Sequence, residues 1–257
     1  MSAPIVILGS GLAGITVARE LRKLDAAVSI TIVTADDGAF YSKPSLSNAL
    51  AAGKTAPQLV LTPRETLAAQ LKLEIRAHTR VTRLLPGEHA IETDSGRLEY
   101  SRLVLALGAQ PIRLPIEGNG AAEIMSVNNL SDYVAFRTRL AGAGRVAILG
   151  GGLIGCEFAN DLRAAGIAVE VFDLAPQALG RLLPDAAAPN FAQGLAAAGA
   201  RIRFNTSIAR VDRAEDGFVL LDAQGKDYSA DLVLSAVGLR PETELARAAG
   251  LDIKRGI

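Results

Sequence analysis

The sequence is poor in the residues on which metal and disulfide chemistry depend. Its 257 residues include one cysteine, two histidines and no tryptophan, and only 4% are aromatic. A single cysteine excludes a disulfide scaffold and a pair of redox-active thiols within this chain. So few cysteine and histidine side chains are also too few for a typical zinc site, which needs three or four nitrogen or sulfur ligands. We therefore expect no metal site.

The chain also lacks an excess of either charge and any long apolar run. Lysine and arginine together number 27, as do aspartate and glutamate, so the zero net charge gives no support for nucleic-acid binding. The longest uncharged apolar run near the middle, Val146–Cys156, is 11 residues long and is too short to span a membrane. The N-terminus has no signal-peptide pattern. We expect a soluble, cytoplasmic protein without a membrane span.

What the chain does have is an internal repeat. The segment PIVILGSGLAGITVARELRKL (4–24) reappears in form as RVAILGGGLIGCEFANDLRAAG (145–166). Each copy is a short β-branched run, then G-x-G-x-x-G, then an amphipathic helical pattern. Downstream, LVLALGAQP (103–111) resembles LVLSAVGLRP (232–241). With 49% hydrophobic residues and a length typical of two modest domains, the chain predicts one fold written twice.

Between these landmarks each copy holds alternating strands around a glycine-containing turn. LEIRAHTRVTRLL precedes HAIETDSGRLEY in the first copy, and ARIRFNTSIARVD precedes GFVLLDAQGKDYSA in the second. We therefore predict an α/β fold of two tandem Rossmann-like domains, each a three-layer arrangement around a parallel sheet with an inserted antiparallel meander. The expected divisions are 1–115, 116–241 and a final segment, 242–257, that returns to the first domain. One large sheet is the alternative, but it does not explain the repeat.

The two glycine loops predict dinucleotide phosphate sites, because each lies between a predicted strand and a predicted helix. The first glycine of each loop permits the tight turn, the second lets the backbone approach a pyrophosphate, and the third lets the helix pack on the sheet. The phosphates would then meet free N–H groups at the positive end of the helix dipole. Glycines used only for turns are the alternative.

An acidic residue is expected after the second strand of each copy, where it binds the adenosine ribose. In the second copy Asp173 lies 18 residues beyond Gly155 and predicts a preference for NADH over NADPH, because a carboxylate repels a 2′-phosphate. The alternative is an exposed turn residue. In the first copy Thr34 stands near the acid's place, and Asp36 is the carboxylate that could substitute for it.

These features together resemble a known family. Two dinucleotide folds, the second inserted in the first, are similar to the FAD-dependent pyridine-nucleotide reductases of the glutathione-reductase superfamily. More narrowly, TADDGAFYSKPSLSNAL, LGGGLIGCEFANDL and SAVGLRPETELARAAGL resemble the bacterial rubredoxin–NAD reductase family, over essentially the whole chain. The resemblance implies FAD in the first domain and NADH in the second. The residues so assigned to FAD are Gly9, Gly11, Leu12, Ala13, Gly14, Thr34, Ala35, Asp36, Val81 and Gly108, and those assigned to NADH are Gly150, Gly152, Leu153, Ile154, Gly155, Asp173 and Gly238.

The resemblance also implies a catalytic pair. Lys43 would lie beside the flavin ring and pair with Glu157, and the backbone around Val81 would meet the adenine. The residues alone leave other interpretations open. Lys43 could be a solvated surface lysine, and Glu157, two residues past Gly155, could be favoured by the helix dipole in a first turn.

The implied activity is an NADH-dependent flavoprotein reductase that passes electrons to a one-electron carrier such as rubredoxin or a similar small iron protein. A disulfide reductase is excluded because Cys156 has no second cysteine in this chain. The alternatives are a ferredoxin-type reductase, an NADH oxidase, and a non-catalytic dinucleotide-binding fragment. The last is motivated by the C-terminus, because the family continues with a further strand and an interface domain. We therefore expect a C-terminally truncated reductase.

Overall fold

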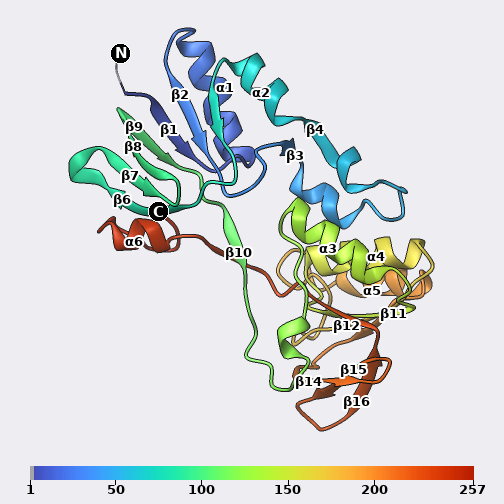
Figure 1. Ribbon diagram of the computed structural model, residues 1–257. Coiled ribbons are helices and arrows are strands. Elements are labelled where there is room, and N and C mark those ends of the chain that lie inside the picture. The colour runs from blue at the N-terminus through green and yellow to red at the C-terminus, as the bar shows by residue number, and fades with distance from the viewer. Residues whose placement is uncertain (1–2) are drawn as a thin grey trace. The chain divides into compact units, whose positions relative to one another are not determined.

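The computed structural model describes residues 3–257, which form two compact units (Figure 1). The first unit comprises Met1–Ser42, Val60–Gln110 and Arg240–Ile257, and the second comprises Lys43–Leu59 and Pro111–Leu239. The segment Lys43–Leu59, which the sequence-based division places in the first domain, therefore belongs to the second unit. Each unit is described below by itself.

The first unit is a three-layer arrangement around a parallel sheet. Four strands lie in the order β5-β2-β1-β9, with β1 hydrogen-bonded in parallel to both β2 and β9. Because successive strand residues point to opposite faces, Ile7 packs in the core with α1 and α2, whereas Val6 and Leu8 pack in the core with the meander. The elements of this unit are β1 (Ile5–Leu8), α1 (Leu12–Leu24), β2 (Ile30–Val33), β3 (Phe40–Tyr41), β4 (Val60–Thr62), α2 (Arg64–Leu71), β5 (Glu74–Arg76), β6 (Val81–Leu85), the 3-10 helix η3 (Pro86–Glu88), β7 (Ala90–Thr93), β8 (Gly96–Glu99), β9 (Arg102–Leu105) and α6 (Glu244–Ala248).

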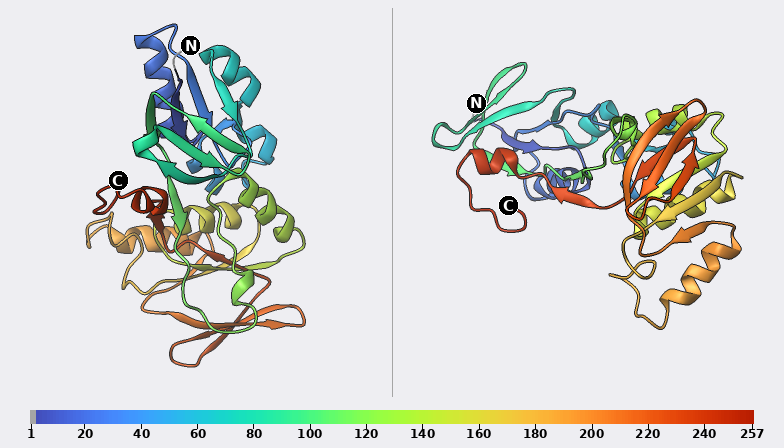
Figure 2. Two further views of the ribbon diagram at one scale, coloured as in Figure 1. Left: turned by 60° about the vertical axis from the view of Figure 1, so that its left-hand side comes forward. Right: turned by 90° about the horizontal axis from the view of Figure 1, so that it is seen from below.

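The meander of the first unit is the antiparallel sheet β6-β7-β8. Its buried residues Leu84 and Ile91 join the apolar cluster of Val6 and Leu8. Helix α6 packs against β6, as Figure 2 shows for the dark red helix beside the green strands. The first unit therefore includes chain from both sides of the second unit in sequence.

The second unit repeats this architecture. Its parallel sheet has the order β13-β12-β11-β17 and its meander the order β14-β15-β16. Helix α4 packs on β11 and β12. The elements are η1 (Lys43–Ser47), η2 (Ala56–Leu59), η4 (Ala121–Glu123), α3 (Leu130–Leu140), β11 (Arg145–Leu149), α4 (Leu153–Ala164), β12 (Ala168–Phe172), α5 (Ala188–Ala197), β13 (Arg201–Arg203), β14 (Ile208–Ala214), β15 (Gly217–Asp222), β16 (Asp227–Ala230) and β17 (Leu232–Ser235), and a two-stranded sheet of β10 (Ala109–Pro111) and β18 (Leu239–Pro241) lies where the chain passes between the units.

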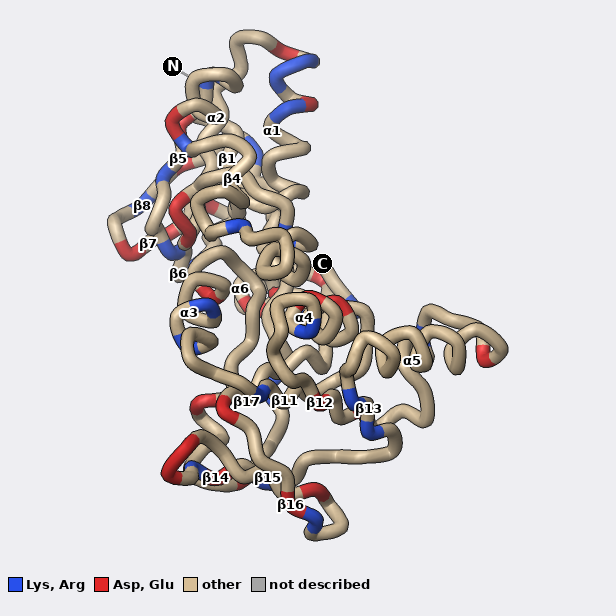
Figure 3. The backbone as a smooth tube through the Cα atoms, turned by 90° about the vertical axis from the view of Figure 1, so that its right-hand side faces the viewer, with Lys and Arg blue, Asp and Glu red and all other residues tan. Residues whose placement is uncertain are grey.

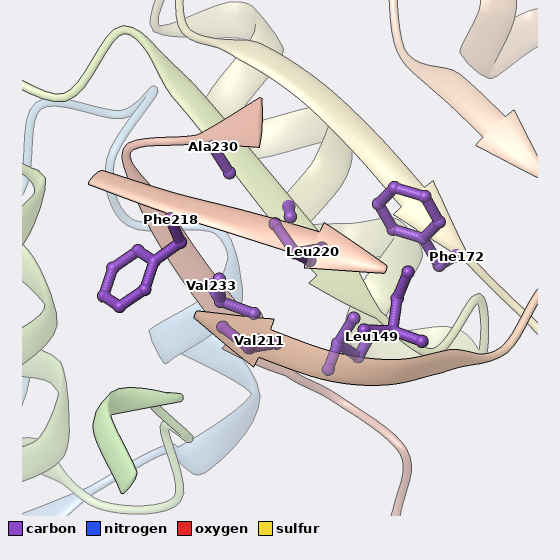
Figure 4. Close-up of a cluster of buried hydrophobic side chains, with 9 residues drawn as sticks. Leu149, Phe172, Val211, Phe218, Leu220, Ala230 and Val233 are labelled. Carbon is purple, nitrogen blue, oxygen red and sulfur yellow. The ribbon is translucent and has the colours of Figure 1, made fainter. Parts of the chain in front are cut away.

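A single apolar cluster joins the two sheets of the second unit (Figure 4). Leu149 and Phe172 contribute from the parallel sheet, and Val211 and Leu220, both fully buried, contribute from the meander. The Phe172 ring meets the Tyr228 ring edge-on, with centroids 4.8 Å apart. Burying this face of each sheet removes apolar surface from water, which is the main force holding the layers together.

The predicted internal repeat is confirmed by equivalent backbone hydrogen bonds in the two units. Gly9 N–H donates to the carbonyl of Val33 at 2.9 Å, and Gly150 N–H donates to that of Phe172 at 2.8 Å. The return strands match as well, because Ala106 N–H donates to Leu8 and Ala236 N–H donates to Leu149. The predicted fold class, two Rossmann-like units with inserted meanders, is therefore correct.

One detail of the predicted meanders is wrong. Residues 74–76 and 201–203 were expected in the antiparallel stretches, but as β5 and β13 they pair in parallel with β2 and β12. The chain leaves each parallel sheet through a residue with positive φ, His78 at +49° and Asn205 at +52°. His78 therefore lies in a turn and not on a strand. Histidine and asparagine are enriched in this left-handed region, which explains their use at equivalent points.

This turn generates a test of the fold. Asn205→Val should destabilise the second unit by about 1–2 kcal/mol, because a β-branched residue is strained at positive φ. Asn205→Gly should retain the unit's stability, because glycine adopts this conformation freely. Thermal unfolding of both variants measures the difference, and equal unfolding temperatures would contradict the assigned conformation.

Candidate functional site

The two glycine loops have the same geometry. Gly9 and Gly150 have φ values of +109° and +105°, and a side chain at either would meet the carbonyl of the return strand, at Ala106 or Ala236. A Cβ on Gly14 would overlap the carbonyl oxygen of Gly9, and the same clash joins Gly155 to Gly150. Each helix therefore passes so close to its strand that only glycine fits.

The middle glycine of each loop faces open space. A Cβ on Gly11 or Gly152 would have no atom within 4 Å, so these glycines are not required by packing. They cap α1 and α4, and neither helix has a side-chain cap or an acidic residue in its first turn. The charges of α1 gather toward its C-terminal half instead (Figure 3). An uncapped helix N-terminus with an open approach is the arrangement that binds a pyrophosphate, so both loops fit the phosphates of a dinucleotide.

The predicted ribose acid of the second unit lies beside its glycine loop. Asp173 follows β12, and its carboxylate accepts hydrogen bonds from Gly151 N–H at 2.5 Å and from Ala175 N–H at 2.8 Å. The side chain is half-buried, and the next residue, Leu174, is 72% exposed. The backbone therefore fixes the carboxylate at the strand's carboxyl end, which is the position that accepts ribose hydroxyls in this fold.

The equivalent position of the first unit is neutral. Ser10 takes the place of Gly151, and its hydroxyl donates to the Thr34 hydroxyl at 3.0 Å. Thr34 also accepts Asp36 N–H at 3.2 Å, and both hydroxyl residues are buried. The hydroxyl–hydroxyl hydrogen bond of Ser10 and Thr34 in the first unit therefore replaces the bond between the Gly151 N–H and the Asp173 carboxylate in the second. Asp36 lies two residues beyond, in the adjoining bend.

Of the remaining expected cofactor residues, Leu12, Ala13, Leu153 and Ile154 lie in the first turns of α1 and α4. The other four lie at the ends of strands. Val81 begins β6, and Ala35 follows Thr34 after β2. Gly108 and Gly238 both have positive φ and follow the return strands β9 and β17. Open α/β sheets bind ligands at the carboxyl ends of their strands. The roles of these residues toward FAD and NADH stay predictions.

The expected pairing of Lys43 with Glu157 is not what the described residues show. Lys43 is exposed, and its Nζ lies 3.4 Å from the Asn128 side-chain oxygen. Glu157 instead accepts the Ser47 hydroxyl at 2.5 Å. Glu157 is also the fifth residue of α4, so it lies beyond the first turn in which the sequence places it. A short hydroxyl donor on the same segment thus takes the position expected of the lysine.

Sequence reasoning missed Asp161, four residues after Glu157 on the same helix. This carboxylate is 4% exposed and accepts two backbone N–H groups from the Lys43–Leu59 segment. A charged residue at an otherwise apolar position of α4 was the available signal.

The single thiol of the chain is unreactive. Burial, together with the nearby Asp173 and Glu157, raises the pKa of Cys156 to about 11, so the thiol stays protonated at neutral pH.

A cavity of about 340 Å³ also lies in the second unit, away from the glycine loop. Its lining includes Arg145, Ala168 and Gly199, at or just before the amino ends of the parallel strands. Its lining Arg145 and Glu170 are already paired, with Asp231 and Arg203 respectively. Since α/β sheets bind dinucleotides at the opposite end, this cavity is not the nucleotide site.

Comparison with known proteins decides the family. The family model of pyridine nucleotide-disulphide oxidoreductases matches residues 3–257. The chain belongs to this family. It is 46% identical to rubredoxin–NAD(+) reductase of Acinetobacter baylyi over 99% of the chain and 67% of that protein. The chain thus spans about two thirds of this relative's length.

Solved structures agree with this assignment. The ferredoxin reductase of Rhodopseudomonas palustris is 27% identical with a TM-score of 0.92, over 100% of this chain and 64% of that one. Putidaredoxin reductase in its covalent complex with putidaredoxin is 31% identical with a TM-score of 0.91, over 99% and 63%. The expected family, fold and oxidoreductase class are confirmed, and FAD and NADH are the cofactors that this membership supports.

No helix of residues 3–257 is long and apolar enough to cross a membrane.

The loop geometry separates packing from binding. Gly155→Ala should destabilise the second unit by about 1–3 kcal/mol, because the added methyl group overlaps a backbone carbonyl. Gly152→Ala should leave the unfolding temperature unchanged and weaken NADH binding, since its methyl group occupies only the open approach to the helix N-terminus. Thermal unfolding and calorimetry with NADH test the pair. Equal NADH affinity in Gly152→Ala and the wild type would remove the phosphate assignment.

Proposed function

We propose that this chain binds FAD in the first unit and NADH in the second, and serves an NADH-dependent flavoprotein reductase that delivers electrons to a small iron carrier such as rubredoxin. The observation that carries the proposal is the pair of uncapped glycine loops of matching geometry, one of which has a carboxylate, Asp173, hydrogen-bonded to it. The named activity of the 46% identical relative supports rubredoxin as the acceptor. A cytoplasmic location stays a prediction.

The two units would divide the work between them. In the second, the N–H groups of the first turn of α4 hold the NADH pyrophosphate while Asp173 accepts the adenosine ribose hydroxyls. In the first, the turn at Gly11 holds the FAD pyrophosphate, beside the neutral pair Ser10 and Thr34. Bound FAD supplies the ability to accept two electrons from NADH and to give them up singly. Thiol exchange has no part, because Cys156 is the only cysteine of the sequence and is buried.

The proposal is tested by mixing the FAD-loaded protein with NADH in the absence of oxygen. Rapid loss of flavin absorbance, followed by its return when oxidised rubredoxin is added, is the expected result. Return with a ferredoxin and not with rubredoxin would assign the kind of acceptor named for the 27% identical ferredoxin reductase. Return with oxygen alone would indicate an NADH oxidase. No absorbance change with NADH would contradict the reductase and leave a dinucleotide-binding protein without catalytic activity.

Asp173 should determine the choice of nucleotide. Asp173→Ala should weaken NADH binding by about 1.5–3 kcal/mol through loss of charge-assisted hydrogen bonds. It should also reduce the preference for NADH over NADPH, because the repulsion of a 2′-phosphate disappears. Asp231→Ala is the matched control, since Asp231 also accepts two backbone N–H groups of this unit, from Gly144 and Arg145. Equal affinities of the wild type for NADH and NADPH would contradict the assignment.

Lys43 should affect reduction more than binding. Lys43→Ala is expected to slow flavin reduction by NADH and to leave the NADH dissociation constant unchanged, because a cation beside the flavin acts where negative charge develops. Lys54→Ala, an exposed lysine on the same segment, is the control. Stopped-flow reduction measures both variants, and an unchanged rate in Lys43→Ala would make it a solvated surface lysine.

A further inference from the structure

The segment Lys43–Leu59 is held on two helices of the second unit. It consists of η1 and η2 joined by a turn, and these two helices pack on α3 and α4. Leu46, Ala49 and Leu59 of the segment are buried. The segment begins with Lys43, the residue for which the family resemblance implies a place beside the flavin. The groups that hold the segment therefore determine where Lys43 is presented.

Polar contacts from the two helices fix the segment along its length. On α4, Glu157 accepts a hydrogen bond from the Ser47 hydroxyl. Asp161, one turn later on the same helix, accepts hydrogen bonds from the N–H groups of Leu50 and Ala51. On α3, the Arg137 guanidinium donates to the carbonyl of Lys54 at 3.0 Å. Residues four apart lie on one face of a helix, so one face of α4 carries both carboxylates that bind the segment.

Asp161 makes the central contact. One carboxylate oxygen accepts Leu50 N–H at 2.9 Å, and the other accepts Ala51 N–H at 2.8 Å. Each oxygen thus has its own backbone donor, and both donors belong to the turn between η1 and η2. An amide in place of the carboxylate would keep one acceptor and point an NH₂ group at the other N–H.

The surrounding groups do not offset the effect of burial on the pKa of Asp161. Burial raises the pKa of its carboxyl above the ordinary value, although the two N–H donors and the nearby Arg137 lower it. Removing a charged carboxylate from water costs free energy, so a buried carboxylate is poor evidence of a contribution to global stability.

We infer that Asp161 is a positioning residue, which fixes the Lys43-bearing segment to the helix that follows the NADH loop by accepting the N–H groups of Leu50 and Ala51. The inference rests on the proposed function for the role of Lys43 in reduction. Helix α4 begins at the loop assigned to the NADH pyrophosphate, so one rigid element carries both the nucleotide loop and the anchor of this segment. Within residues 3–257, the Asp161 carboxylate hydrogen-bonds to Leu50 and Ala51 and to neither the nucleotide loop nor Lys43, so it acts through the segment.

The test compares Asp161→Asn with the wild type in the 257-residue chain. Hydrogen exchange should show one of the two amides, Leu50 or Ala51, exchanging about tenfold faster in the variant, because that donor loses its acceptor. Asp222→Asn is the matched control. Asp222 is also buried and accepts two backbone N–H groups, from Gln224 and Lys226, but it lies in the meander and should leave residues 43–59 protected.

A second readout separates positioning from a general loss of structure. In the FAD-loaded protein, Asp161→Asn should lower the limiting rate of flavin reduction several-fold while the NADH dissociation constant stays the same. Unchanged exchange of Leu50 and Ala51 would overturn the inference, and so would a loss of NADH affinity as large as the loss of rate. If the wild type is not reduced by NADH, the proposed function fails, and exchange still decides whether Asp161 holds the segment.

Discussion

The close approach of a helix to the strand before it is the constraint on which both units depend. At Gly14 and Gly155 the helix backbone lies against the carbonyl of the first loop glycine, so that no side chain fits between them. This contact fixes the direction of α1 and α4 and aims their uncapped N-termini at the carboxyl ends of the parallel strands. The return-strand contacts follow from that geometry, and so do the proposed phosphate sites and the place of the proposed ribose acid.

Divergence between the copies is confined to what surrounds this shared frame. Gly151 and Asp173 in the second unit correspond to Ser10 and Thr34 in the first, so a charged contact is replaced by a pair of buried hydroxyls. The backbone hydrogen bonds on either side are kept, as Thr206 N–H to Asp173 and Thr79 N–H to Thr34 show, both at 2.9 Å. One architecture therefore presents a carboxylate beside one phosphate site and a neutral surface beside the other. This difference distinguishes the two proposed sites, whereas the assignment of FAD to the first unit and NADH to the second comes from the family resemblance.

The sequence predicted the features that depend on local patterns. The glycine loops, the apolar strands and the order of elements each require particular residues at fixed spacing, so they could be read without coordinates. Strands β5 and β13 were misplaced because a short, half-exposed edge strand alternates polar and apolar residues just as a meander strand does.

Contacts between distant segments could not be read in this way. The bonds from Leu50 and Ala51 to Asp161 join residues 111 and 110 positions apart. No periodicity signals such a bond, and Glu157 pairs with Ser47 rather than with the expected Lys43. Assignment of the Lys43–Leu59 segment to the second unit therefore required the structure.

The central claim is that the two loops are specialised, the first for FAD and the second for NADH. Hydrogen exchange of the chain with each nucleotide added alone tests it most directly, because the ligand's phosphates should protect the N–H groups at the helix N-terminus that binds them. The account predicts that FAD protects the first turn of α1 and that NADH protects the first turn of α4. Protection of both helices by either nucleotide, or of α1 by NADH alone, would contradict it.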